Sequence, residues 1–113
     1  MAKPIPVTVT VTIPAGQSLS NSADLSVGSV SYIMMPPDWT PANMSFQVSN
    51  DNINFADLYD VWGVELLRAM GAGRACMVDT SYTQAALYVK LRSGPSVNPV
   101  KQAADRTITL VLV

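Results

Sequence analysis

The residue types that perform most acid–base and metal chemistry are scarce in this chain. Its 113 residues contain no histidine and a single cysteine, Cys76. Without an imidazole there is no Ser-His-Asp or Cys-His arrangement and no histidine-based zinc or iron site, so most hydrolase mechanisms are excluded. Cys76 lies between Ala75 and Met77, which predicts a small buried hydrophobic side chain; a thiol that pairs between subunits is the alternative.

The remaining candidates for catalysis or metal binding are four neighbouring carboxylates, Asp51, Asp57, Asp60 and Glu65. Two such acids can hydrolyse a glycosidic bond when they lie on opposite sides of it. Asp51 is explained more simply as a turn residue, and Asp57 as a polar residue on an exposed strand face. An EF-type calcium loop is not predicted, because its ligand positions after Asp51 hold Ile53 and Phe55, whereas a calcium site of backbone carbonyls stays open. We therefore expect no enzyme, no catalytic residue and no cofactor.

Aromatic side chains near turns are the candidate contact residues. Trp39 lies between Pro37 and Pro41, where a helix is excluded and a large ring can close one end of a core, so we expect it to be at least half buried. Trp39, Tyr59 and Trp62 could also form a sugar-stacking platform, although aromatic residues near turns more often fill a core. The candidate interface or ligand contacts are therefore Pro37, Trp39, Tyr59 and Trp62.

Length and composition limit the classes of protein to consider. The chain is long enough for one domain, residues 1–113, and charged residues make up 13% of it with a net charge of −1, against about 25% charged residues in ordinary soluble domains. Either a partner covers part of the surface, or Ser, Thr, Asn and Gln replace charge. The basic residues form no stripe, so nucleic acid is not expected. No export signal and no apolar run of membrane-spanning length is found, so no membrane partner is expected.

The elements that would position these side chains are short strands. Apolar residues alternate with polar ones over residues 7–13, 44–49, 87–92 and 107–113, which is the period of a half-buried strand. Residues 23–34 indicate two short strands or one bent strand, and residues 61–70 a short strand, although a helix is also compatible with their spacing. Residues 76–78 indicate another short strand, residues 81–85 a helical turn, and residues 71–74 a hairpin turn. Together these patterns predict an all-β fold, an antiparallel jelly-roll-like β-sandwich of about eight short strands.

Several sequence blocks carry a resemblance to a known family. They are Ile13-Pro-Ala-Gly-Gln-Ser-Leu-Ser, Ile33-Met-Met-Pro with Trp39-Thr, Ser45-Phe-Gln-Val-Ser-Asn-Asp, Phe55-Ala-Asp-Leu-Tyr-Asp, Leu91-Arg-Ser-Gly and Gln102-Ala-Ala-Asp-Arg-Thr-Ile-Thr-Leu. Over nearly the whole chain they resemble small proteins that are encoded among the structural genes of tailed bacteriophages. The Ser-Phe-Gln-Val-Ser block by itself also resembles discoidin-type sugar- and lipid-binding sandwiches. The chain departs from the phage family at Asn52, where a hairpin glycine is common, and at Leu66-Leu67-Arg68.

The resemblance implies a non-enzymatic virion structural protein made in the host cytoplasm. We expect a capsid decoration (cement) protein or a head-spike component, at the capsid surface or a vertex, that binds the major capsid protein or other virion proteins. It could also bind a second copy of itself as a homo-oligomer. The alternative is a carbohydrate-binding, discoidin-like or lectin-like adhesion module whose ligand is a glycan.

Overall fold

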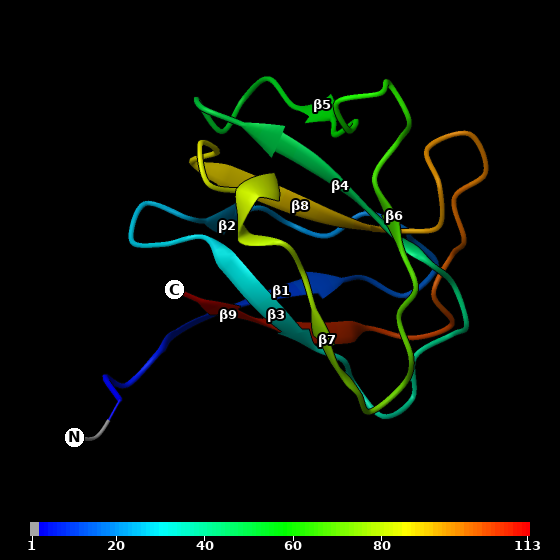
Figure 1. Cartoon of the computed structure of the whole chain (residues 1–113). Helices are drawn as coiled ribbons and strands as arrows, with labels where there is room; N and C mark the ends of the chain where they lie inside the picture. The colour runs from blue at the N-terminus through cyan, green and yellow to red at the C-terminus, as the bar shows by residue number, and fades with distance from the viewer. Residues whose placement is uncertain (1–2) are drawn as a thin grey trace.

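The computed structural model describes residues 3–113, and its regular secondary structure consists almost entirely of strands (Figure 1). The strands in chain order are β1 Val7–Ile13, β2 Ala23–Asp24, β3 Val30–Met34, β4 Met44–Ser49, β5 Ala56–Asp57, β6 Leu67–Arg68, β7 Ala75–Met77, β8 Tyr88–Ser93 and β9 Arg106–Leu112. One 3₁₀ turn, η1 Thr80–Tyr82, separates β7 from β8. The all-β prediction is confirmed.

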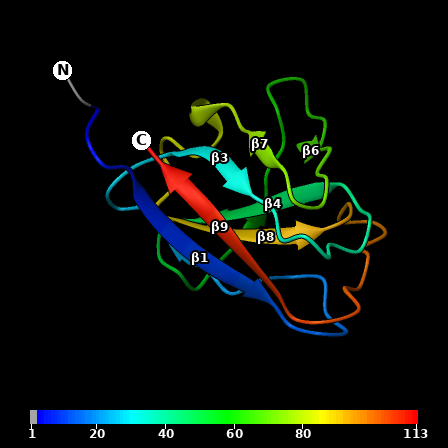
Figure 2. The ribbon, with the colours of Figure 1, turned by 90° about the horizontal axis from the view of Figure 1, so that it is seen from below.

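The strands form two antiparallel sheets that pack against each other. One sheet has the order β1-β9-β3-β7, and the other has the order β2-β8-β4-β5, with β6 also paired to β4. Figure 2 shows β1, β9 and β3 side by side in front of β8 and β4. The chain changes sheet at every connection except those within β4-β5-β6, so strands adjacent in sequence mostly lie in opposite sheets. Two antiparallel sheets packed face to face in this way form a β-sandwich, as predicted.

The strongest alternating patterns of the sequence form the centre of the sandwich. Strands β1 and β9 pair in a regular register along all of β1, from Val7 opposite Leu112 to Ile13 opposite Arg106. Their inward-facing residues Val11, Ile13, Ile108 and Leu110 are fully buried, whereas the threonines between them lie on the outer face. The opposite sheet contributes alternate residues of β4 and β8 in the same way. The core residues from these four strands include Val11, Ile13, Met44, Phe46, Val89, Leu91, Ile108 and Leu110.

Strand β3 departs from simple alternation. The sequence places Val30, Tyr32 and Met34 on one face, but the register of β3 against β9 shifts between Val30 and Tyr32. This irregularity inserts one residue, which turns the following side chains over. Val30 and Ile33 are therefore buried, and Met34 lies exposed on the outer face.

The region around residues 61–70 is less regular than the sequence suggests. No helix forms there; β6 contains only two residues, Leu66 is buried, and Val64 is exposed. The turn at Gly71–Arg74 exists, with the Arg74 N–H donating to the Gly71 carbonyl. It does not close a hairpin, because β6 and β7 belong to different sheets. The predicted helical turn is present, slightly earlier, as η1.

Two simple expectations about surface chemistry can be compared with the structure. Cys76 lies in β7 with intermediate exposure and is a free thiol packed against the core. Among residues 3–113, no helix is both long enough and apolar enough to span a bilayer.

Candidate functional site

The four candidate contact residues divide between two loops. Pro37 and Trp39 belong to the loop from β3 to β4, whereas Tyr59 and Trp62 belong to the segment between β5 and β6. Trp39 is only 5% exposed, and its Nε1–H donates to the Ala42 carbonyl at 3.2 Å. The expectation that this ring closes the core is confirmed, and a buried ring cannot serve as a sugar platform. Pro37 beside it is exposed.

A buried polar cluster holds the Trp39 loop in place. The Gln102 side-chain amide accepts from the Thr40 N–H at 2.9 Å and donates to the Thr40 carbonyl at 3.1 Å, as a neighbouring strand would. Arg106 donates to the same Gln102 oxygen at 3.1 Å and forms an ion pair with Asp38 at 3.0 Å. Gln102 is 1% exposed and Arg106 is 5% exposed. This cluster positions a buried structural element and offers no accessible reactive group.

The segment Leu58–Leu66 forms a small hairpin that we call the Trp62 hairpin. Its arms are joined by backbone bonds between Leu66 and Leu58 and by an isolated bridge between Tyr59 and Glu65. At its tip the Asp60 carboxylate accepts the N–H groups of Trp62 at 2.9 Å and Val64 at 3.0 Å. An aspartate side chain that takes up backbone donors in this way defines a tight turn.

The tip of the Trp62 hairpin has a glycine where the backbone requires one. Gly63 has a φ of 78°, in the left-handed region that glycine adopts without steric cost. The tip is therefore a turn with a defined backbone conformation.

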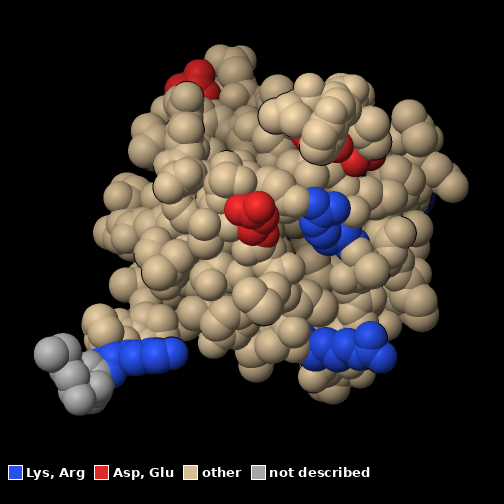
Figure 3. Space-filling model, viewed as in Figure 1, with Lys and Arg blue, Asp and Glu red and all other residues tan. Residues whose placement is uncertain are grey.

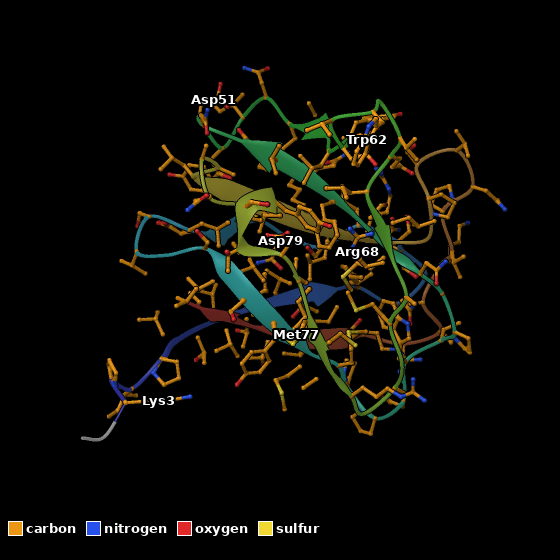
Figure 4. The ribbon with its side chains drawn as sticks, viewed as in Figure 1. Lys3, Asp51, Trp62, Arg68, Met77 and Asp79 are labelled. Carbon is orange, nitrogen blue, oxygen red and sulfur yellow. The ribbon has the colours of Figure 1, made fainter. Side chains whose placement is uncertain are left out.

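The tip displays apolar side chains to solvent. Trp62 is 84% exposed, and Val61, Val64 and Tyr59 are also among the exposed large hydrophobic residues. Figure 4 shows Trp62 in the upper part of the molecule beside β5, away from Met77 and Lys3. A contiguous group of exposed apolar residues on a rigid turn is typical of a surface that binds another molecule. Of the four candidates, Tyr59 and Trp62 lie together on such a surface.

A buried arginine attaches the Trp62 hairpin to the sandwich. The Arg92 guanidinium in β8 donates to Asp57 at 2.8 Å, to Glu65 at 3.3 Å and to the Ser45 hydroxyl at 2.9 Å. The Arg92 side chain is only 8% exposed. The second Glu65 oxygen accepts the Ser96 N–H at 3.0 Å. The hydrogen bond from Arg92 holds the pKa of Asp57 below its ordinary value.

This cluster corrects one interpretation and was absent from the sequence analysis. Asp57 is the ion-pair partner of a buried arginine rather than a simple polar residue on an exposed face. Alternation places Arg92 on the outward side of its strand with Tyr88 and Lys90, which predicts exposure. Nothing in the local pattern shows that the Trp62 hairpin folds over this position, so the sequence carries no signal for its burial.

The acidic side chains that the sequence analysis singled out take part in turns and ion pairs. Asp51 is a turn residue as predicted: its carboxylate accepts the N–H groups of Ile53 at 2.9 Å and Asn54 at 2.8 Å, and these bonds lower its pKa. Asn52 in this turn has a φ of 59°, which asparagine tolerates better than most residues. In the part of the chain that the structure describes, no three Asp, Glu or Cys side chains cluster as metal ligands would.

Two surface hollows remain. One, of about 560 Å³, lies between the amino-terminal arm Lys3–Pro6 and the ends of β3 and β9, and the other, of about 390 Å³, lies between β4 and the η1 region. Neither hollow includes Trp62 or a group of converging charged side chains. The face seen in Figure 3 is mostly uncharged, with isolated basic and acidic side chains, so this face offers no large patch of one charge sign.

Comparison with known proteins gives a structural relative only. No protein-family model matches the chain, and no curated protein matches its sequence. The crystal structure of the SPBc2 prophage-derived protein YomS is similar, with a TM-score of 0.56 and 13% sequence identity. The similarity covers 99% of this chain and 97% of that chain. At this low identity, the chain shares its fold with that protein over the full length of both.

Proposed function

We propose that this chain is a non-enzymatic structural protein of a tailed bacteriophage particle. The observation that carries the proposal is the fold shared over 99% of the chain with a prophage-derived protein. The sequence resemblance to small products of phage structural genes supports the same origin. The absence of histidine from the sequence supports a role in assembly rather than in catalysis.

Within the particle, the proposed role is that of a capsid decoration protein or a head-spike component that binds the major capsid protein. The Trp62 hairpin is the proposed contact surface, because its tip is apolar, exposed and held by Asp60 and Arg92. A rigid tryptophan at the centre of a small apolar surface is a common energetic anchor of protein–protein interfaces. Preorganisation by the two polar contacts reduces the ordering cost of binding.

The small number of charges makes a prediction about how such an attachment responds to salt. The chain has 7 basic and 8 acidic side chains without a run of either sign. Since the Debye length falls to about 3 Å in 1 M salt, an attachment held by charge weakens there, whereas one held by apolar burial persists. We expect the protein to stay on its particle in 1 M sodium chloride and to be released by urea.

The test uses particles of the phage that encodes the chain, grown without its gene and then incubated with purified protein. Wild-type protein should co-sediment with the particles, and Trp62→Ala should reduce the bound amount at subsaturating concentration by on the order of tenfold or more, as expected for an interface anchor. Val97→Ala is the matched control, because Val97 is 91% exposed on a different loop, and it should bind normally. Absence of the chain from wild-type virions by mass spectrometry would overturn the proposal.

A second candidate function is glycan binding by the same hairpin. The specific observation in its favour is that Tyr59 and Trp62 are both exposed on one turn, and exposed aromatic rings can stack on sugars. A glycan array separates the two functions. Binding to a defined glycan that is lost in Trp62→Ala, with no co-sedimentation on particles, would favour the adhesion module over the virion component.

A further inference from the structure

The free edge of strand β1 differs from the other sheet edges. Strands β2, β5 and β7 also lie at edges and contain two, two and three residues. Strand β1 contains seven residues, and its register with β9 has no irregularity. It also contains neither a charged residue nor a proline. Native proteins usually protect edges with short strands, charges, prolines or bulges, and β1 has none of these.

The hydrogen-bonding direction of each residue in β1 follows from two independent observations. The Thr12 N–H donates to the Asn21 side-chain oxygen at 2.8 Å, and the Thr12 carbonyl accepts the Asn21 N–H at 3.3 Å. Thr12 therefore faces away from β9. On the far side of β9, Val113 exchanges both backbone bonds with Ser29, at 3.0 and 2.9 Å. Because directions alternate in antiparallel pairs, even-numbered residues of β9 bond to β1 and its odd-numbered residues face β3.

Both observations assign Thr8 and Thr10 to the open side of β1. Their N–H and C=O groups point away from β9, and Asn21 reaches only Thr12. Among residues 3–113, no hydrogen bond to these two backbones is found outside the β1–β9 ladder. Both threonines are exposed. The open edge thus has two donors and two acceptors in a strand conformation.

The side chains at this edge are incompletely covered as well. Val7 and Val9 point toward the core side of the sheet, as Val11 and Ile13 do, yet Val7 is 46% exposed and Val9 is only partly buried. The opposite sheet does not reach far enough to cover them. A strand that paired with this edge would also cover apolar surface.

We propose that the open edge of β1 pairs with β1 of a second copy of this chain around a two-fold axis at Val9. In this register Thr8 lies opposite Thr10 of the second copy, and the reverse pair is equivalent. Each pair exchanges two N–H···O bonds, so all four open groups of each copy find a partner. The two four-stranded sheets then join edge to edge into one continuous sheet.

The same register explains where the pairing ends. In this register Pro6 of one copy would follow opposite Thr12 of the other, but Asn21 occupies that position, so the pairing stops before it. Pro6 has no backbone N–H to satisfy, and the Thr12 groups already bond to Asn21. A two-fold pair therefore leaves no additional donor without a partner at either end. Because the open groups of one edge complement those of the same edge about a two-fold axis, a second copy is the proposed occupant, and this proposal does not depend on a place in a virion.

The first experiment measures the mass in solution by light scattering. Wild-type protein should have twice the 12.1 kDa mass of the chain. Thr10→Pro removes the N–H on the open side, where an edge strand tolerates proline, and should give folded monomer by circular dichroism. Thr10→Val keeps the N–H and should remain dimeric. A monomeric wild type, or a Thr10→Pro protein that stays dimeric, overturns the proposal.

The second experiment tests the register with cysteine pairs in a Cys76→Ala background. Val9→Cys should form an intermolecular disulfide, because facing residues of a non-hydrogen-bonded pair have Cα atoms about 4.5 Å apart, within the range for a disulfide. Thr12→Cys should not, because its counterpart would lie about 20 Å away at a rise of about 3.4 Å per residue. Cross-linking through position 12 and not position 9 would overturn the proposed pairing.

Discussion

Trp39 and Trp62 are the same residue type, each on a loop held by a buried arginine, but their environments are opposite. Trp39 is 5% exposed on the loop that Arg106 and Gln102 hold, and Trp62 is 84% exposed on the hairpin that Arg92 holds. In one region the polar cluster closes the core around the ring. In the other it fixes a turn whose ring remains in solvent. In both regions a buried arginine holds a loop, but the ring completes the core in one and is exposed to solvent in the other.

The loss of stability when each tryptophan ring is removed tests whether the two environments differ as described. Trp39→Ala should lower the free energy of unfolding by about 3–5 kcal/mol, because a large buried side chain leaves a cavity. Trp62→Ala is the matched control and should change it by less than about 0.5 kcal/mol, as exposed substitutions usually do. Urea unfolding followed by circular dichroism measures both. Equal losses for the two variants would contradict the assigned environments.

Replacing each buried arginine tests whether it holds its own loop independently of the other loop. Arg92→Met leaves the Asp57 and Glu65 carboxylates without their ion-pair partner and should cost about 1–3 kcal/mol, the usual cost of an unsatisfied buried polar group. Exchange of backbone amide hydrogens should become faster within residues 58–66 and keep its wild-type rate in residues 36–42. In Arg106→Met, amide exchange should instead become faster within residues 36–42 and keep its wild-type rate in residues 58–66.

Arg74→Met, at an exposed arginine, is the control for the loss of a positive charge and should affect neither loop. Faster exchange in both loops of either arginine variant would show that the two regions are not held independently.

The smallest expected effect is a pH dependence that belongs to the Trp62 side. Arg92 lowers the pKa of Asp57 from its ordinary 3.8, so the charged pair stabilises the fold above about pH 4 and this contribution is lost as the pH falls through the lower folded pKa. Asp57→Asn should therefore be less stable than wild type near neutral pH, and the gap should narrow in acid.

In the Arg92→Met background, the effect of Asp57→Asn on unfolding should be smaller at every pH, because the two side chains are coupled. Urea unfolding of the four proteins as a function of pH measures this. A gap between wild type and Asp57→Asn that is independent of pH would contradict the ion pair as the cause.

The sequence alone predicted the strands that have a period-two pattern and the turns that need particular residues. The alternation of β1, β4, β8 and β9 was predicted, because burying one face of a strand demands apolar residues at every second position. The turn at Asp51 was predicted for a local reason as well, since its carboxylate bonds to backbone groups only two and three residues away. The position of Trp39 between Pro37 and Pro41 also predicted that its ring is at least half buried, which is confirmed.

Features that depend on contacts between distant segments could not be predicted from the sequence and became visible only in the three-dimensional structure. The shift in β3 is set by its pairing with β9, which lies far along the chain. Arg92 has the sequence pattern of an exposed strand residue, but it is buried where it pairs with Asp57 of β5 and Glu65 of the Trp62 hairpin. For the same reason the sequence could not separate Trp39 from Trp62 as contact residues. Local spacing determines which way a side chain points, but its burial depends on what other segments place above it.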